Sequence, residues 1–151
     1  MPDEPEMVST RIIVDADACP RTVLGICTAV AREKQAAVIT VASHNHLINS
    51  DCHVTVGDAP QAADLRILNL SRKGDVVVTQ DWGLAAMVLG KEARCLSPSG
   101  RQYRPETIDT MLEIRDMKAR HRRTGGRTRG PRKRTADDDR RFEEGLRRIL
   151  E

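Results

Sequence analysis

RIIVDADACP, residues 11–20, is a short apolar run that ends in two aspartates. A run of β-branched residues of this length predicts a buried central strand of an α/β sheet. Open α/β sheets bind ligands just beyond the carboxyl ends of their strands, which is where Asp15 and Asp17 stand. On an extended chain, side chains two residues apart leave on the same side. This stretch therefore predicts a site with paired carboxylates.

Paired carboxylates favour a metal ion. Two carboxylates held close together repel each other, and a divalent cation such as Mg²⁺ or Mn²⁺ relieves that repulsion. The alternative is that an aspartate caps the helix that begins near Pro20, as Asp often does at a helix N-terminus. Capping accounts for one of the two aspartates and leaves the other unexplained.

Strand and helix patterns alternate along residues 11–96. Strands are predicted at residues 11–15, 37–42, 53–56, 75–81 and 93–96, and helices at 20–35, 60–74 and 84–89. Alternation at this spacing predicts an α/β fold, a three-layer α/β/α sandwich with a mainly parallel sheet. Further C-terminal helices are expected at residues 106–120 and from Asp137 onward.

Three segments are expected along the chain: a flexible N-terminus (residues 1–10), an α/β domain (residues 11–120), and a basic linker with a C-terminal helix (residues 121–151). No run of the sequence approaches a membrane span, and the acidic start does not read as a signal peptide. The four cysteines form no Cys-x-x-Cys pair, so we expect reduced thiols in a cytoplasmic protein. The oligomeric state is left open.

The charge is unevenly distributed. Residues 1–100 hold nine Lys and Arg against 12 Asp and Glu, whereas residues 101–134 hold 12 against four. An acidic body with a basic arm predicts a polyanionic partner, a nucleic acid and most plausibly RNA. Aromatic residues make up 2% of the chain, which predicts no platform for stacking bases.

The basic arm, residues 118–134, contains nine Lys and Arg and no acid. Arg dominates, which favours bidentate contacts with phosphate, and the alternative is a solvated, disordered tail. The residues predicted to bind the phosphates of a substrate are Lys118, Arg120, Arg122, Arg123, Arg127 and Arg129.

Two further aspartates complete a candidate catalytic cluster. Asp81 follows the strand through Val78, and Asp64 lies on the otherwise apolar flank of the helix at 60–74, where an unpaired carboxylate is costly. With Asp15, Asp17 and Asp81 as ligands, Mg²⁺ or Mn²⁺ would activate water against a phosphodiester. Asp81 is equally a good N-cap for the next helix. Thr79 either offers its hydroxyl to a ligand or is an ordinary strand residue.

The sequence resembles the YaiI/YqxD family of bacterial proteins over nearly all of residues 11–151. The likeness rests on seven short matches in the same order: VDADACP at 14–20, AD at 63–64, DVVVTQD at 75–81, SG at 99–100, RD at 115–116, GP at 130–131 and DR at 139–140. That family looks like a branch of the PIN-like nuclease superfamily, whose members cut RNA with clustered acids and a divalent metal.

The resemblance implies a PIN-like three-layer α/β/α fold and a catalytic cluster of Asp15, Asp17, Asp64 and Asp81. Relatives often carry another acid three residues before the position of Asp64, and Gln61 stands there in this chain. That departure predicts a weak or narrowly selective enzyme.

Two other functions compete with a nuclease. A phosphatase of the haloacid-dehalogenase type also opens with a strand ending in Asp-x-Asp, whose first aspartate is a nucleophile. Pro20 leaves no room for the flap of such enzymes, and no Lys precedes a later acidic pair. The third candidate is a non-catalytic RNA-binding protein that uses the basic arm alone.

Overall fold

The fold is built around a six-stranded sheet in the order β3-β2-β1-β4-β5-β6. The computed structural model describes residues 10–43, 50–125 and 132–151. All neighbouring strands are parallel except β5 and β6, which are antiparallel. The strands are β1 (Arg11–Asp15), β2 (Ala37–Ala42), β3 (Cys52–Thr55), β4 (Val76–Val78), β5 (Arg94–Leu96) and β6 (Gln102–Tyr103).

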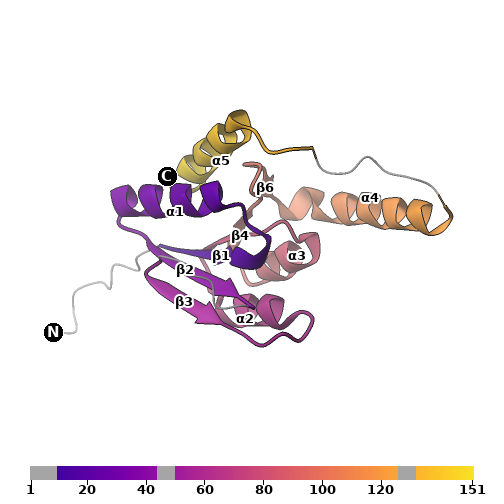
Figure 1. Cartoon of the computed structure of the whole chain (residues 1–151), viewed down its shortest axis with the longest axis horizontal. Helices are drawn as coiled ribbons and strands as arrows, with labels where there is room; N and C mark the ends of the chain where they lie inside the picture. Colours follow the sequence, from indigo (N-terminus) through magenta and orange to yellow (C-terminus); the bar gives the residue numbers. More distant parts are fainter. Residues whose placement is uncertain (1–9, 44–49, 126–131) are drawn as a thin grey trace.

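Helices cover both faces of the sheet. Figure 1 shows α1 and α5 on one face, α2 and α3 on the other, and α4 leading away from the body. The predicted three-layer α/β/α sandwich with a mainly parallel sheet is therefore confirmed. The helices are α1 (Arg21–Lys34), α2 (Ala62–Leu70), α3 (Trp82–Gly90), α4 (Pro105–Arg123) and α5 (Ala136–Ile149), with a short 3₁₀ helix, η1 (Ala16–Ala18), between β1 and α1.

The central strands β1 and β4 carry apolar runs, residues 12–14 and 76–78, because both of their faces are buried. Ile12 and Val14 of β1 pack in the core beneath α1 and α5, whereas Ile13 packs in the core beneath α2 and α3. Side chains alternate along a strand, so Asp15 shares the face of Ile13. The carboxylate of Asp15 is thereby directed towards the α2 and α3 layer.

Helix α5 completes the layer that α1 begins. Its buried residues Phe142, Leu146 and Ile149 belong to the same core cluster as β1 and α1. Polar contacts fix its position: Thr22 Oγ1 donates to Asp139 Oδ1 at 2.8 Å, and the Arg147 guanidinium pairs with Glu33 at 2.7 Å. The C-terminal helix is thus an integral layer of the sandwich.

Several boundaries differ from the sequence expectation. Helix α2 ends at Leu70, short of the predicted Gly74, and α4 runs three residues past its predicted end at 120, to Arg123. Strand β6 and helix η1 were not predicted, because two or three residues are too few to show a periodic pattern. Residues 1–9, most of the predicted flexible N-terminus, lie outside the described residues. No helix in the described part of the chain is long and apolar enough to cross a membrane.

Candidate functional site

Three of the four predicted aspartates meet at the carboxyl ends of the two central strands. The strand order reverses between β1 and β4, and open α/β sheets bind ligands in the crevice at such a switch point. Asp15 is the last residue of β1, and Asp81 stands three residues beyond the end of β4. Asp64 joins them from the first turn of α2. The topology therefore brings together residues that are far apart in sequence.

Asp15 is the buried member of this group, with 5% of its surface exposed. Its Oδ2 accepts a hydrogen bond from Thr79 Oγ1 at 3.0 Å. Burial raises the pKa of Asp15 above its usual value, and the charges of Asp17 and Asp81 raise it further, while the Thr79 bond opposes both. Such a carboxylate gains from any cation that reaches it.

Thr79 holds the two strand ends together. Its hydroxyl donates to Asp15 and accepts the backbone N–H of Asp81 at 3.0 Å, while its carbonyl accepts the Tyr103 hydroxyl at 3.1 Å. The ring of Trp82 in turn meets Tyr103 edge-on, with ring centres 4.8 Å apart. The hydroxyl of Thr79 is thus engaged in orienting aspartates, and its contact with a substrate stays a prediction.

Asp81 is the N-cap of α3, as the sequence indicated. Its Oδ1 accepts the backbone N–H groups of Gly83 at 2.9 Å and Leu84 at 3.3 Å. The same oxygen lies 3.8 Å from the guanidinium of Arg115 on α4. Capping engages one carboxylate oxygen and orients the other, so the capping role and a ligand role are compatible.

Asp64 lies beside the carboxyl group of Asp81. Partial burial, the adjacent carboxyl group of Asp81 and the charge of Asp15 raise the pKa of Asp64 to about 6. Carboxylates held close together disfavour the charged form. Asp64 therefore takes up a proton at a higher pH than an isolated aspartate does.

Asp17 does not lie where the sequence predicted. The chain turns into η1 directly after Asp15, so the expectation that both side chains leave an extended strand on the same side is wrong. Asp17 is exposed, and its Oδ2 accepts the backbone N–H of Ser43 at 2.8 Å. Its charge still raises the pKa of Asp15, which places it at the margin of the cluster.

The four aspartates offer only carboxylate oxygens, the ligand type that Mg²⁺ and Mn²⁺ prefer. Across the described residues, no group of three or more Asp, Glu, His or Cys side chains is arranged to hold a metal ion.

The basic residues of α4 border this acidic edge. Lys118 and Arg122 line a hollow of about 300 Å³ together with Arg115, Trp82 and Arg101. Arg120 is bound elsewhere, in an ion pair with Asp116 at 3.4 Å, and Arg123 ends the helix exposed. The predicted phosphate ligands Arg127 and Arg129 lie outside the described residues.

Sequence reasoning missed the residues that link the acidic edge to this hollow. Arg115 and Trp82 contact or adjoin Asp81, but neither was assigned a role in the site, although Arg115 belongs to the RD match at residues 115–116. Trp82 is the one tryptophan of the chain, and its position directly after Asp81 is the signal that a search of the sequence could have used. Because aromatic residues make up only 2% of the chain, no base-stacking role was predicted for it.

Cys19 and Gln61 are two further residues close to the aspartates in sequence. Burial raises the pKa of the Cys19 thiol to about 12, so this cysteine stays protonated near neutral pH and is a packing residue. Gln61 is exposed at the N-cap of α2, with a left-handed backbone at φ 68°. It stands on the same turn that presents Asp64.

Comparison with known proteins places this site in a family. The family model described as uncharacterised BCR, YaiI/YqxD family, matches residues 13–151. A UPF0178 protein of Heliobacterium modesticaldum is 56% identical over 140 residues, covering 93% of this chain and 96% of that protein. UPF0178 proteins of Clostridium acetobutylicum and Exiguobacterium sibiricum are 43% and 36% identical, again covering 93% of this chain and 96% of each relative. No solved structure matches the chain significantly. The resemblance read from the sequence is confirmed, and the chain belongs to the YaiI/YqxD family.

Proposed function

We propose that this protein is a divalent-metal-dependent ribonuclease of PIN-like type that hydrolyses RNA phosphodiesters. The observation that carries the proposal is the meeting of Asp15, Asp64 and Asp81 at the switch point of the sheet. Asp15 is buried beside the charges of Asp17 and Asp81, and no cation among the described residues pairs with it. Such a carboxylate is costly, which favours a cation from solution.

The donor type at this edge of the sheet, carboxylate oxygen, suits Mg²⁺ or Mn²⁺. Asp15, Asp17 and Asp81 are the proposed ligands, and Asp17, whose Oδ2 accepts the backbone N–H of Ser43, would have to turn towards Asp15 to join them. When bound, such an ion lowers the pKa of a water ligand and neutralises charge on the phosphodiester. Asp64, with its pKa raised to about 6, is suited to take up or release a proton near neutral pH.

The other residues orient these groups and the substrate. Thr79 holds the carboxylate of Asp15 and the backbone of Asp81 in fixed relation. Lys118 and Arg122 would contact phosphates of RNA beside the acidic edge. The basic arm would contribute Arg120, Arg123, Arg127 and Arg129 to the same sequence-independent binding.

One observation disfavours the phosphatase alternative. Only five residues, 16–20, connect β1 to α1, and three of them form η1. A flap of the haloacid-dehalogenase type needs an insertion at this point, and none is present between these two described elements. Burst release of phosphate from a generic monoester would nevertheless restore that alternative.

The metal site is tested by titrating Mn²⁺ into the protein and following the melting temperature. A ligand that binds only the native state stabilises it by about 2.7 kcal/mol at 100 times its Kd. We expect the shift in wild type and in Asp109→Asn, an exposed aspartate of α4. A shift that persists in Asp15→Asn combined with Asp81→Asn would exclude these aspartates as the ligands.

Catalysis is tested with structured and single-stranded RNAs in Mn²⁺. Asp15→Asn is expected to lose activity by more than about 100-fold, the upper range for a change that only disturbs metal ligands indirectly. Asp109→Asn, purified in the same way, is the matched control and keeps wild-type activity. Equal cleavage by wild type and Asp15→Asn would identify a contaminant. RNA binding without any cleavage would favour the non-catalytic alternative.

A further inference from the structure

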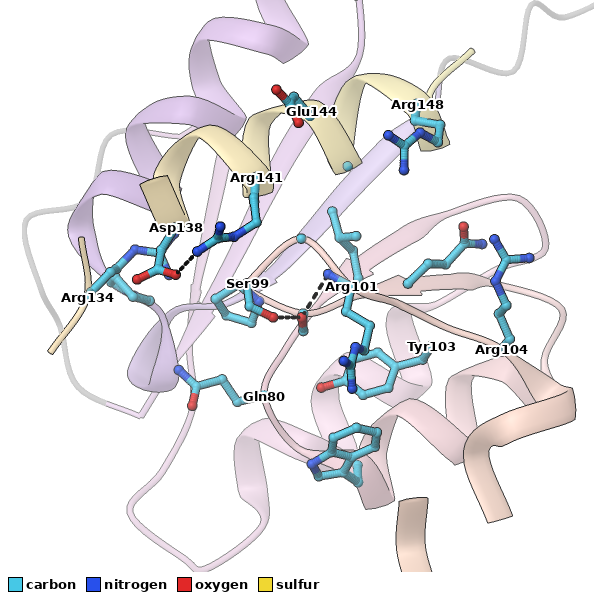
Figure 2. Close-up of a pocket in the computed structure, with 18 of the residues that line it drawn as sticks. Gln80, Ser99, Arg101, Tyr103, Arg104, Arg134, Asp138, Arg141, Glu144 and Arg148 are labelled. Carbon is cyan, nitrogen blue, oxygen red and sulfur yellow. Dashed lines mark hydrogen bonds and ion pairs between the residues drawn. The ribbon is translucent and has the colours of Figure 1, made fainter. Parts of the chain in front are cut away.

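A second, larger hollow lies between α5 and the loop of residues 97–104 (Figure 2). It measures about 990 Å³. Gln80 and Trp82, the two neighbours of Asp81 in sequence, belong to its wall. The hollow therefore reaches the residues that flank one of the candidate catalytic aspartates in sequence.

The walls of this hollow are locked together by two glycines. Gly100 has a positive φ of 90°, and a Cβ placed there would collide with the backbone carbonyl of Arg141 on α5. A Cβ on Gly145 would lie 2.6 Å from the carbonyl oxygen of Gly100. Loop and helix thus touch backbone to backbone, which only glycine permits. The hollow is a built feature, because its two walls cannot slide apart without breaking this contact.

The lining is strongly cationic. Two acids, Asp138 and Glu144, face six arginines: Arg101, Arg104, Arg132, Arg134, Arg141 and Arg148. Three of the arginines serve the structure. Arg132 and Arg141 bind Asp138 at 2.8 and 3.0 Å, and Arg134 binds Asp139 at 2.6 Å.

The remaining three arginines are available to a ligand. Within the described part of the chain, Arg101, Arg104 and Arg148 have no carboxylate partner, and Figure 2 shows them around the hollow. Arg101 comes from the loop, Arg104 precedes α4, and Arg148 projects from α5. Guanidinium groups without a carboxylate partner, two from the loop of residues 97–104 and one from α5, surround one hollow and favour phosphate, which they bind in a bidentate manner.

The two hollows adjoin each other. Trp82 and Arg101 line both of them, so positively charged side chains follow one another from Lys118 and Arg122 on α4, through Arg101, to Arg148 on α5. Trp82, the residue directly after Asp81, belongs to both walls, where its ring could stack on a base of a bound strand.

We propose that the hollow between α5 and the loop of residues 97–104 binds the phosphates of a single RNA strand on one side of the acidic cluster, while the α4 hollow binds the strand on the other side. That the bound strand leads to a cleavage site rests on the proposed function. Strand binding itself is independent of the metal and can be measured without it.

The test is binding of a short single-stranded oligoribonucleotide in EDTA, followed by the fluorescence of Trp82, the one tryptophan of the chain. Wild type is expected to show quenching on binding. Arg104→Ala combined with Arg148→Ala should lower affinity about tenfold and flatten the dependence of log K on log salt by about 2 units, the effect of losing two phosphate contacts. The matched control, Arg32→Ala with Lys34→Ala, removes the same charge from the far end of α1 and should leave that dependence unchanged.

Three outcomes would overturn the inference. The first is equal affinity of the hollow variant and the control. The second is binding without any change in Trp82 fluorescence, and the third is equal affinity for a duplex RNA. Cleavage assays keep the proposed function separate. If wild type cleaves RNA while the hollow variant binds it normally, only this inference fails. If the hollow variant loses binding and wild type never cleaves, the inference stands and the nuclease proposal fails.

Discussion

Two aspartates of this protein are equally buried but have opposite electrostatic surroundings. Asp15 and Asp75 are each 5% exposed, Asp15 at the carboxyl end of β1 and Asp75 just before the start of β4. Asp75 receives two hydrogen bonds from the guanidinium of Arg11, the shorter at 2.6 Å, and one from the backbone of Arg72. Asp15 receives a hydroxyl and has acids for neighbours.

This difference separates structure from function. A buried carboxylate that is paired and hydrogen-bonded is what a fold needs for its own stability. A buried carboxylate beside like charges lowers the stability of the fold. Its presence is the reason for proposing a ligand, because a cation that binds there would offset this loss. The two carboxylates lie at opposite edges of the sheet. Asp15 is at the carboxyl end of β1, whereas Asp75 precedes the amino end of the adjacent strand β4 and pairs with Arg11 at the start of β1.

The largest effect is expected at the paired aspartate. Arg11→Met leaves the carboxylate of Asp75 buried without its partner, and we expect a loss of about 3–5 kcal/mol in the free energy of unfolding. Urea denaturation measures it. Arg32→Met, an exposed arginine of α1, is the control and should change stability by less than about 0.5 kcal/mol. Equal effects of the two substitutions would erase the contrast.

The unpaired aspartate should respond with the opposite sign. In metal-free buffer, Asp15→Asn removes a buried charge that Asp17 and Asp81 repel, while its amide oxygen can still accept the Thr79 hydroxyl. We expect the free energy of unfolding to rise, because the substitution removes a buried charge and the repulsion that acts on it. Thermal unfolding with EDTA present measures the gain. A loss of stability would show that Asp15 is a structural residue.

A pH titration sharpens the contrast further. The pKa of Asp64 is raised from 3.8 to about 6, so between these values the native state holds a proton that the unfolded state has released. Stability should therefore fall as pH rises from about 4 to about 6, by less than about 1 kcal/mol because solvent screens a partly exposed group. Asp64→Asn should remove this slope, and saturating Mn²⁺ should shift it to lower pH. An unchanged slope in Asp64→Asn would place the titration elsewhere.

The smallest effect is expected where both charges are exposed. Lys73 and Glu92 form an ion pair at 3.5 Å with side chains 80% and 69% exposed. Lys73→Ala should change the free energy of unfolding by less than about 0.5 kcal/mol. A larger loss in urea denaturation would mean that pairing alone, and not burial, sets the value of a charge in this protein.

The sequence predicted most of the strands of the sheet and three of the aspartates that meet at the strand ends. Continuous valine and isoleucine runs identify β1, β2 and β4, and the spacing between them requires crossover helices. Asp15 and Asp81 followed from the rule that ligands bind at strand ends. Asp64 followed from its place on an apolar helix flank, because a carboxylate there needs a reason.

The remaining features depend on contacts that no local pattern encodes. The turn at Ala16 moves Asp17 away from the face of Asp15, and no glycine or proline marks it in advance. The hollow beside α5 is formed by a loop and a helix about 40 residues apart in sequence. Its arginines are therefore scattered along the chain, and the sequence gives no sign that they share a site. The glycine pair that locks it is visible only when the two backbones are in contact.

The docking of α5 has a consequence for the order in which the chain becomes active. Contacts such as Thr22 to Asp139 and Glu33 to Arg147 join segments more than 100 residues apart, and folds that depend on such contacts form slowly. A chain emerging from the ribosome can assemble β1, β2 and β4 long before Phe142 exists to cover them. One wall of the arginine hollow is absent from that nascent chain. The arginine hollow, which is the proposed path of the RNA strand, is therefore completed after the strands of the central sheet have been synthesised.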